Sequence, residues 1–190
     1  MPANNFLFDH SAPFYDRLIP PPDPQRLQAF LNLPTEGWLL EAGGGTGRIA
    51  ALLAPLVGRL VVSDLSGPML AESMAKTIAC PVQADVSHLP FPDGHFDRVL
   101  VVDALHHFSY QQQAVAELVR VLKPGGRLVI EEPDITQLQV KFVALAEKVA
   151  LMGSHFHSPD EIAAMIADCG LPARIEKEER FAAWIIADKK

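Results

Sequence analysis

The sequence predicts a doubly wound α/β fold, in which helices cover both faces of a mostly parallel, seven-stranded sheet. Strand-like and helix-like segments alternate along the chain, which is typical of a parallel sheet with crossover helices. The continuous apolar run at residues 99–102 indicates a strand that is buried on both faces. Two closely spaced strand-like segments near the end of the chain indicate a hairpin, so we expect the last strand to be antiparallel.

The expected elements follow from apolar periodicity and from turn residues. We expect strands at residues 38–41, 59–63, 81–84, 96–102, 127–131, 174–177 and 181–187. Helices are expected at residues 25–33, 47–56, 68–77, 111–122, 137–151 and 159–169. In sheets of this kind a ligand binds beyond the carboxyl ends of the strands, where the strand order reverses. The turns that follow the parallel strands should therefore surround one crevice.

Length and composition favour one ordinary domain over residues 1–190, with residues 1–24 as an N-terminal arm or lid bounded by the proline-rich residues 20–24. The formal net charge of −7 disfavours nucleic acid as a partner, because such binding depends on neutralising phosphates. We see neither a signal peptide nor an apolar run of about 20 residues, so we expect a cytoplasmic protein without an integral membrane segment. Cys80 and Cys169 form no CxxC pair, and we expect both to be buried and reduced.

A glycine-rich turn follows the first expected strand, at residues 41–47 (EAGGGTG). Glycine permits a positive φ and lets a ligand approach the backbone, and the helix that follows presents free N–H groups. The spacing is G-x-G-x-G, and Arg48 occupies the third glycine position of the dinucleotide fingerprint. On the glycines alone, a tight turn without a ligand remains the alternative.

Carboxylates follow the next two strands. Asp64 can accept hydrogen bonds from the ribose hydroxyls of a nucleoside, or it can serve as a charge or cap at the next helix. Asp85 can accept a hydrogen bond from an adenine amino group, or it can simply form a turn. Because the three features occupy three successive strand ends, their coincidence favours a nucleoside site.

At these residues the sequence resembles the class I methyltransferases that depend on S-adenosylmethionine (SAM). The segments that carry the resemblance are residues 39–48 (LLEAGGGTGR), 62–66 (VSDLS), 84–97 (ADVSHLPFPDGHFD) and 121–128 (VLKPGGRL). Their order is similar to that of the small-molecule enzymes of ubiquinone and menaquinone biosynthesis, which the arm at residues 8–16 also resembles. The resemblance implies a three-layer, Rossmann-like methyltransferase fold, SAM as cofactor, and methyl transfer to a small-molecule acceptor.

The resemblance also implies roles around the first two strand ends. Glu41 anchors the hydrogen bonds of the glycine turn, while Gly43 and Gly45 pack against the methionine part of SAM. Asp64 holds the ribose, and Leu65 packs on the adenine.

Further roles are implied around the cavity that these residues would form. Asp85 and the backbone of Val86 meet the amino edge of the adenine. Asp103 and its neighbours line the sulfonium end of the cofactor. Tyr15, in the N-terminal arm, would close over the bound cofactor.

The SAM methyl group is already activated, so the enzyme mainly aligns the acceptor and excludes water. A general base is needed for some acceptors, and the candidates are His106 and His107, whose alternative role is packing. His155 and His157 are further candidates. We expect no metal site, since the histidines show no HExxH spacing.

The acceptor pocket is expected to use the arm and residues 135–157, whose apolar side chains face either a small acceptor or the core. These side chains are Phe142, Leu145, Met152 and Phe156. Two alternatives stay open. One is a nicotinamide-dependent oxidoreductase of doubly wound fold, and the other is a SAM-binding module without catalytic activity.

Overall fold

The computed structural model of the protein describes residues 23–76, 79–149, 153–177 and 181–190. Within this part of the chain one seven-stranded sheet has the order β3-β2-β1-β4-β5-β7-β6. The strands are β1 (Thr35–Ala42), β2 (Val57–Asp64), β3 (Cys80–Gln83), β4 (Phe96–Val102), β5 (Leu122–Pro133), β6 (Ala173–Lys177) and β7 (Ala182–Asp188). The predicted fold class is therefore confirmed.

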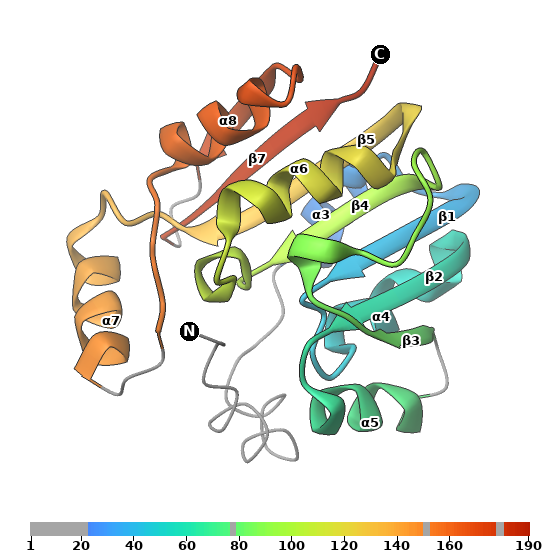
Figure 1. Ribbon diagram of the computed structural model, residues 1–190, viewed down its shortest axis with the longest axis horizontal. Helices are drawn as coiled ribbons and strands as arrows, with labels where there is room; N and C mark the ends of the chain where they lie inside the picture. Colours follow the sequence, from blue (N-terminus) through green and yellow to red (C-terminus); the bar gives the residue numbers. More distant parts are fainter. Residues whose placement is uncertain (1–22, 77–78, 150–152, 178–180) are drawn as a thin grey trace.

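β7 is the antiparallel strand of the sheet. It pairs antiparallel with both β5 and β6, whereas the pairs from β3 to β5 are all parallel. Figure 1 shows its arrow pointing opposite to those of its neighbours. Antiparallel strands can be joined by a short connection, while parallel strands need a crossover, so the close spacing of the last two strands predicted this hairpin correctly.

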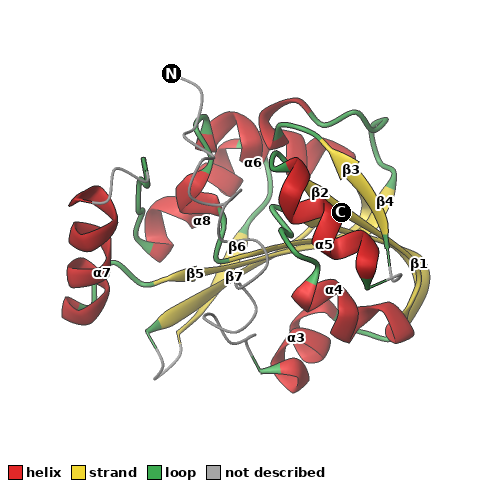
Figure 2. Ribbon diagram, turned by 90° about the horizontal axis from the view of Figure 1, so that it is seen from below, coloured by secondary structure: helices red, strands yellow, loops and turns green. Residues whose placement is uncertain are grey.

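Helices cover both faces of the sheet (Figure 2). α6 (Gln111–Val121) and α8 (Pro159–Asp168) pack on one face, and α3 (Pro24–Leu31), α4 (Arg48–Leu53) and α5 (Gly67–Ala75) supply side chains to the core of the other. Each face has its own cluster of buried apolar side chains. β4 serves both clusters, because Val99 and Val101 point into one and Leu100 and Val102 into the other. This is why its sequence is apolar without alternation.

Local hydrogen bonds fix where the helices begin. Ser66 Oγ accepts the N–H of Met69 at 3.3 Å, so Ser66 is the N-cap of α5. Ser158 and Glu161 form a capping box at the start of α8. α4 begins at Arg48, one residue later than expected, because Gly47 takes a left-handed conformation with φ +69°.

α7 (Leu138–Val149) lies apart from the sheet, beyond the carboxyl ends of the parallel strands (Figure 1). Its apolar side chains Phe142 and Leu145 are 64% and 58% exposed. The alternative that these residues are ordinary core is therefore wrong. They border the same end of the sheet as the predicted crevice.

Other expectations need correction. Cys80 is exposed, because it begins β3 at the edge of the sheet, and Cys169 is partly buried; both thiols are free. β5 starts at Leu122, five residues before the expected position, because Leu122 pairs with Phe96 of β4. None of the helices in the described ranges is both long and apolar enough to cross a bilayer.

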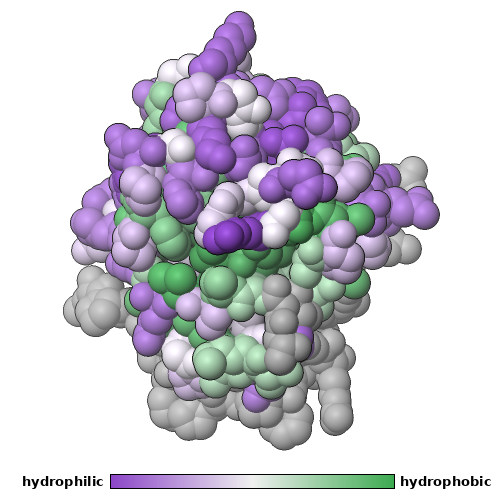
Figure 3. Space-filling model, turned by 90° about the vertical axis from the view of Figure 1, so that its right-hand side faces the viewer, coloured by the Kyte–Doolittle hydropathy of each residue, from purple (hydrophilic) through white to green (hydrophobic). Residues whose placement is uncertain are grey.

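The amino-terminal ends of the parallel strands lie on the right of Figure 1, and this side carries mainly hydrophilic side chains around an apolar band (Figure 3). Asp97 joins three strands here. Its Oδ2 atom accepts the N–H of Trp38 in β1 at 2.7 Å and a hydrogen bond from Lys123 Nζ in β5 at 2.8 Å. Gly37 is required beside it, since a Cβ there would collide with the Asp97 carboxyl group.

We predict that Asp97→Asn lowers the free energy of unfolding by about 1–2 kcal/mol at pH 7, through loss of charge-assisted hydrogen bonds. Burial alone would raise the pKa of Asp97, but the bonds from Lys123 and Trp38 outweigh it and hold the pKa below its ordinary value of 3.8. The stabilisation is thus present above about pH 4 and is lost as the pH falls through the lowered pKa.

Urea unfolding at pH 7 and at pH 3 measures this difference, which should shrink at the lower pH. Asp93→Asn is the matched control, because the Asp93 side chain is 83% exposed in its ion pair with Arg120. This control should change stability by less than about 0.5 kcal/mol. Equal effects of the two substitutions at pH 7 would contradict the assignment.

Candidate functional site

A cavity opens at the carboxyl ends of β1, β2 and β4, where the strand order reverses between β1 and β4. Including its open mouth it measures about 1020 Å³. It is lined by Glu41, Gly43, Gly44, Gly45, Arg48, Ile49, Asp64, Leu65, Ser66, Met69, Ala84, Asp85, Val86, Val102, Asp103, Ala104, His107, Phe108 and Ser109. Eight of the nine predicted cofactor residues are in this lining.

The glycine turn after β1 is held against β2. The N–H groups of Gly43 and Gly44 both donate to the carbonyl of Ser63, at 2.8 and 3.1 Å. The glycines of this turn differ in which group occupies the space that a Cβ atom would take. A Cβ at Gly43 would lie 2.8 Å from the Cβ of Ala104, so Gly43 lets the next turn pack closely.

Gly45 is the glycine of this turn that is open toward the cavity. Its φ is +53°, and a Cβ there would meet nothing closer than Met69 Sδ at 3.8 Å and Asp64 Oδ2 at 3.9 Å. The space beside its backbone is therefore available to a ligand. This is the bare stretch of backbone that the sequence predicted, but it is confined to one residue.

Asp64, at the end of β2, connects the glycine turn to the start of α5. Its Oδ2 accepts the N–H of Gly45 at 2.8 Å, and its Oδ1 accepts the N–H of Ser66 at 2.8 Å. The helix-start alternative is thus visible in the structure, whereas the contact of Asp64 with a ribose remains a prediction. The carboxylate organises the helix start, and it also lines the cavity.

Glu41 is buried below the turn, with 2% of its surface exposed. Burial raises the pKa of its carboxyl group to about 8, although the charge of Arg48 and the N–H of Ala50 both lower it. The bond from Ala50 satisfies one of the free N–H groups at the start of α4, whose cap residue Gly47 has no side chain to do so. Glu41 therefore holds the start of α4, and its anchoring of the glycine turn remains a prediction.

Leu65, Asp85 and Val86 line the cavity on the β2 and β3 side. Leu65 is 43% exposed, which leaves an apolar surface at the mouth. Asp85 Oδ1 accepts both the N–H and the hydroxyl of Ser87, at 2.9 and 2.7 Å, so its side chain forms the turn that was the alternative to ligand binding. Its contact with adenine remains a prediction.

Asp103 and His107 line the cavity on the β4 side. Burial raises the pKa of Asp103 to about 6, and the charge of His106 opposes this shift. Burial, together with the charge of His106, lowers the pKa of His107 to about 3, so its imidazole is neutral at neutral pH. His107 Nδ1 lies 3.1 Å from Ser154 Oγ.

His106 does not line the cavity and is 3% exposed. Its Nδ1 lies 2.6 Å from Glu132 Oε2 at the end of β5. Burial alone would lower the pKa of His106, but the charge and hydrogen bond of Glu132 raise it to about 9. A protonated, enclosed imidazole is not a general base, so the geometry favours a positioning role for His106.

Sequence reasoning missed Glu132. Its Oε1 atom accepts the N–H groups of Ala104 and Leu105, at 2.9 and 2.6 Å, so it shapes the turn after β4 that carries both histidines. The available signal was a carboxylate just after the buried run of the neighbouring strand, because adjacent parallel strands end at the same edge of the sheet.

Several candidates lie elsewhere. Tyr15 and the arm fall outside the described residues, as does Met152. His155 Nδ1 lies 2.8 Å from the carbonyl of Gly153, and His157 pairs with Glu161 at 3.6 Å; neither lines the cavity. Phe156 stacks on His106, with ring centroids 4.3 Å apart.

The fold is similar to that of solved SAM-dependent methyltransferases, and the cavity lies where the glycine turn and the strand-end carboxylates meet. A family model described as a methyltransferase domain matches residues 40–130, which include the glycine turn, Asp64, Asp85 and Asp103. This segment of the chain is therefore similar to methyltransferase domains.

Among curated relatives, the ubiquinone/menaquinone biosynthesis C-methyltransferase UbiE of Pseudomonas fluorescens is 40% identical, over 50% of this chain and 41% of the relative. The chain thus spans less than half the length of the relatives it matches.

Solved structures share the fold at low sequence identity. A SAM-dependent methyltransferase from Thermotoga maritima has a TM-score of 0.80 at 21% identity, covering 97% of this chain and 99% of that one. The complex of DhpI with S-adenosylhomocysteine has a TM-score of 0.77 at 19% identity, covering 97% and 94%. The overall fold is therefore shared with known methyltransferases.

We predict that Gly45→Ala weakens binding of S-adenosylhomocysteine by about tenfold or more, roughly 1.4 kcal/mol, because the new methyl group projects toward the ligand's space. The left-handed backbone adds a folding cost of about 1–2 kcal/mol. Gly125→Ala is the matched control, since Gly125 has φ +78°, no neighbour within 4 Å and no part in the cavity.

Isothermal titration calorimetry of both variants separates the two effects. Gly125→Ala should show the folding cost with unchanged affinity. If both variants bind like the wild type, Gly45 does not face the cofactor.

We predict that Asp64→Asn weakens the same binding by about 1–3 kcal/mol, because a neutral amide replaces a carboxylate that holds Gly45 and faces the cavity. Asp160→Asn, an equivalent change in the exposed first turn of α8, should leave affinity unchanged. Calorimetry at a temperature where both variants are folded measures the affinity of each for S-adenosylhomocysteine. An Asp64→Asn protein with wild-type affinity would remove this carboxylate from the binding site.

Proposed function

We propose that this chain transfers a methyl group from SAM to a small-molecule acceptor and releases S-adenosylhomocysteine. The observation that carries this proposal is the single cavity in which the open backbone of Gly45, the Asp64 carboxylate and the apolar side chain of Leu65 meet. These groups match the amino-acid, ribose and adenine parts of one ligand.

Each part of the cofactor has a proposed partner in the cavity. The methionine part lies along Gly45, near the start of α4. A carboxylate offers about four acceptor sites, so Asp64 can hold the turn and the ribose hydroxyls together. The adenine lies against Leu65, with Asp85 and Val86 at its amino edge.

The β4 side of the cavity is proposed to receive the acceptor. Asp103 and His107 lie there, next to the expected position of the sulfonium. Orientation of the acceptor along the S–CH₃ bond can lower the barrier by about 7–11 kcal/mol. His107 is the histidine that reaches the acceptor side, whereas His106 and Glu132 hold the turn in place.

The acceptor is proposed to be small. The net charge of −7 disfavours nucleic acid, and the relatives in quinone biosynthesis act on small molecules.

We further propose that residues 1–190 act as one domain in the cytoplasm, and that residues 1–24, with Tyr15, close over the cofactor.

The sheet topology argues against the nicotinamide-dependent alternative. The dinucleotide-binding fold has the strand order 3-2-1-4-5-6, and here β7 inserts antiparallel between β5 and β6. The glycine spacing also departs from the dinucleotide fingerprint at Arg48.

Ligand-dependent stability tests the cofactor assignment. SAM and S-adenosylhomocysteine should raise the melting temperature, whereas NAD should not, because a ligand stabilises the fold it binds. A shift with NAD alone would overturn the proposal.

Release of S-adenosylhomocysteine over a panel of quinol, phenol, thiol and amine acceptors tests the transfer itself, with Gly45→Ala as the impaired control. Tight SAM binding without transfer to any acceptor would favour the non-catalytic alternative.

A further inference from the structure

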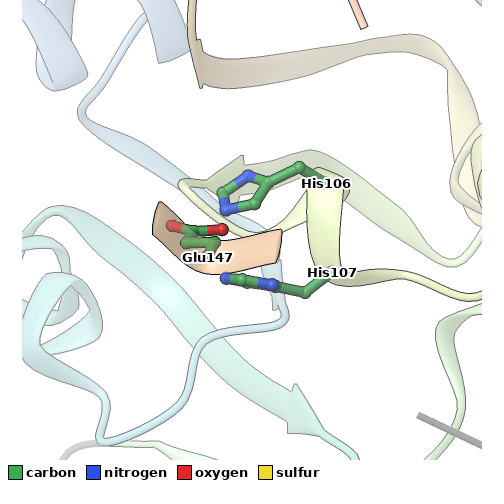
Figure 4. Close-up of side chains that lie close together, drawn as sticks. All are labelled: His106, His107 and Glu147. Atoms are coloured by element: carbon green, nitrogen blue, oxygen red, sulfur yellow. The ribbon is translucent and has the colours of Figure 1, made fainter. Parts of the chain in front are cut away.

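Three side chains with metal-ligating atoms meet beside the cofactor cavity. His106 and His107 come from the short helix η4 (Leu105–His107), and Glu147 comes from α7, forty residues later. One ligand atom from each lies within 4.8 Å of the others. Figure 4 shows both imidazole rings directing a nitrogen toward the Glu147 carboxylate. We propose that His106, His107 and Glu147 bind a divalent transition-metal ion such as Zn²⁺.

The Glu147 carboxylate provides the second observation. Its Oε2 atom is buried and has no hydrogen-bond partner among the described residues. A buried acceptor oxygen without a partner is costly, typically by about 1–3 kcal/mol. A bound cation between this oxygen and the two imidazoles would satisfy it.

Both histidines are oriented by a second group on the side away from Glu147. His106 Nδ1 lies 2.6 Å from Glu132 Oε2, and His107 Nδ1 lies 3.1 Å from Ser154 Oγ. With Nδ1 engaged in each ring, Nε2 is the nitrogen directed inward. A carboxylate that orients a histidine in this way is the usual outer shell of a metal ligand.

The outer shell is itself fixed. Glu132 Oε1 accepts the N–H groups of Ala104 and Leu105, which leaves its other oxygen facing His106. Phe156 stacks on the His106 ring. The imidazole is therefore preorganised, so an ion would not have to order it.

Two imidazoles and one carboxylate form the ligand set of catalytic zinc sites, with a fourth position left open. Fe²⁺ takes the same set. At Zn–N distances of about 2.0–2.1 Å, tetrahedral ligand atoms lie roughly 3.3 Å apart. The three ligand atoms, now within 4.8 Å of one another, must move closer together to bind the ion. Glu147 is the side chain that can move, because α7 stands apart from the sheet.

The histidines have no HExxH spacing, so the sequence predicted no metal site. The ligands instead come from two segments that only the fold brings together, and the ion takes the place of the proton that a histidine ligand must give up. Because His107 also lines the cavity, the ion would lie next to the bound cofactor.

This position assigns a chemical class to the acceptor, an inference that rests on the proposed function. An acceptor hydroxyl or thiol would lose its proton to solvent on binding the ion, as coordinated thiols and water do readily. Its lone pair would then form the bond to the methyl carbon. The S–CH₃ bond would break with its electron pair retained on sulfur, which gives neutral S-adenosylhomocysteine.

The test uses the full chain, freed of any affinity tag and stripped with a chelator. Native mass spectrometry should show one Zn²⁺ per chain, and competition with a chromophoric chelator gives its affinity. Glu147→Gln should weaken Zn²⁺ binding by about tenfold or more, because it removes the charged ligand oxygen. Glu36→Gln, the same change at an exposed residue of β1, should match the wild type.

X-ray absorption at the zinc edge of the wild-type protein tests the ligand set without any variant, and two imidazoles should be present at about 2.0–2.1 Å. Equal Zn²⁺ affinity of Glu147→Gln and the wild type would overturn the proposal, and so would a spectrum without imidazole ligands. Affinity for S-adenosylhomocysteine, measured in parallel, separates the two proposals: intact cofactor binding with no specific zinc overturns the metal site alone.

Discussion

The cavity depends on one carboxylate, that of Asp64. Its two oxygens accept N–H groups from Gly45 and Ser66, which belong to different connections of the sheet. Without this carboxylate, the two N–H groups would lose the acceptor that they share. The position of the glycine turn, the start of α5 and the open space beside Gly45 therefore follow from one side chain.

A second carboxylate has the same role on the other side of the reversal in strand order. Glu132 holds the N–H groups of Ala104 and Leu105 and one ring nitrogen of His106. Each half of the cavity is thus shaped by an acid at the end of one strand that organises the turn after its neighbour. The first acid faces the expected cofactor, and the second stands behind the residues expected at the acceptor.

Much of the fold could be predicted because its signals are local. The apolar run of β4 indicates burial on both faces of the sheet, and the short spacing between the last two strands indicates a hairpin. The start of β5 could not be predicted, because its first residues extend only through pairing with Phe96. Similarly, the exposure of Cys80 depends on β3 lying at the sheet edge, which is a property of strand order.

The candidate site divides in the same way. The glycines and the acids Asp64 and Asp85 are visible in the sequence, since each directly follows an expected strand. That Gly43 admits Ala104 while Gly45 stays open could not be seen, because it depends on what packs nearby. The meeting of Glu147 with two histidines also required the structure, as did the link from Glu132 to His106.

The separation of α7 from the sheet has a consequence for how such a protein can diversify. Substitutions at distant, independent sites add in their effects on stability, and most of the outward side chains of α7 belong to neither apolar cluster. New side chains on this helix can therefore be introduced with little effect on the packing of the sheet. Under the proposed function, acceptor preference and cofactor binding would then be separately adjustable traits.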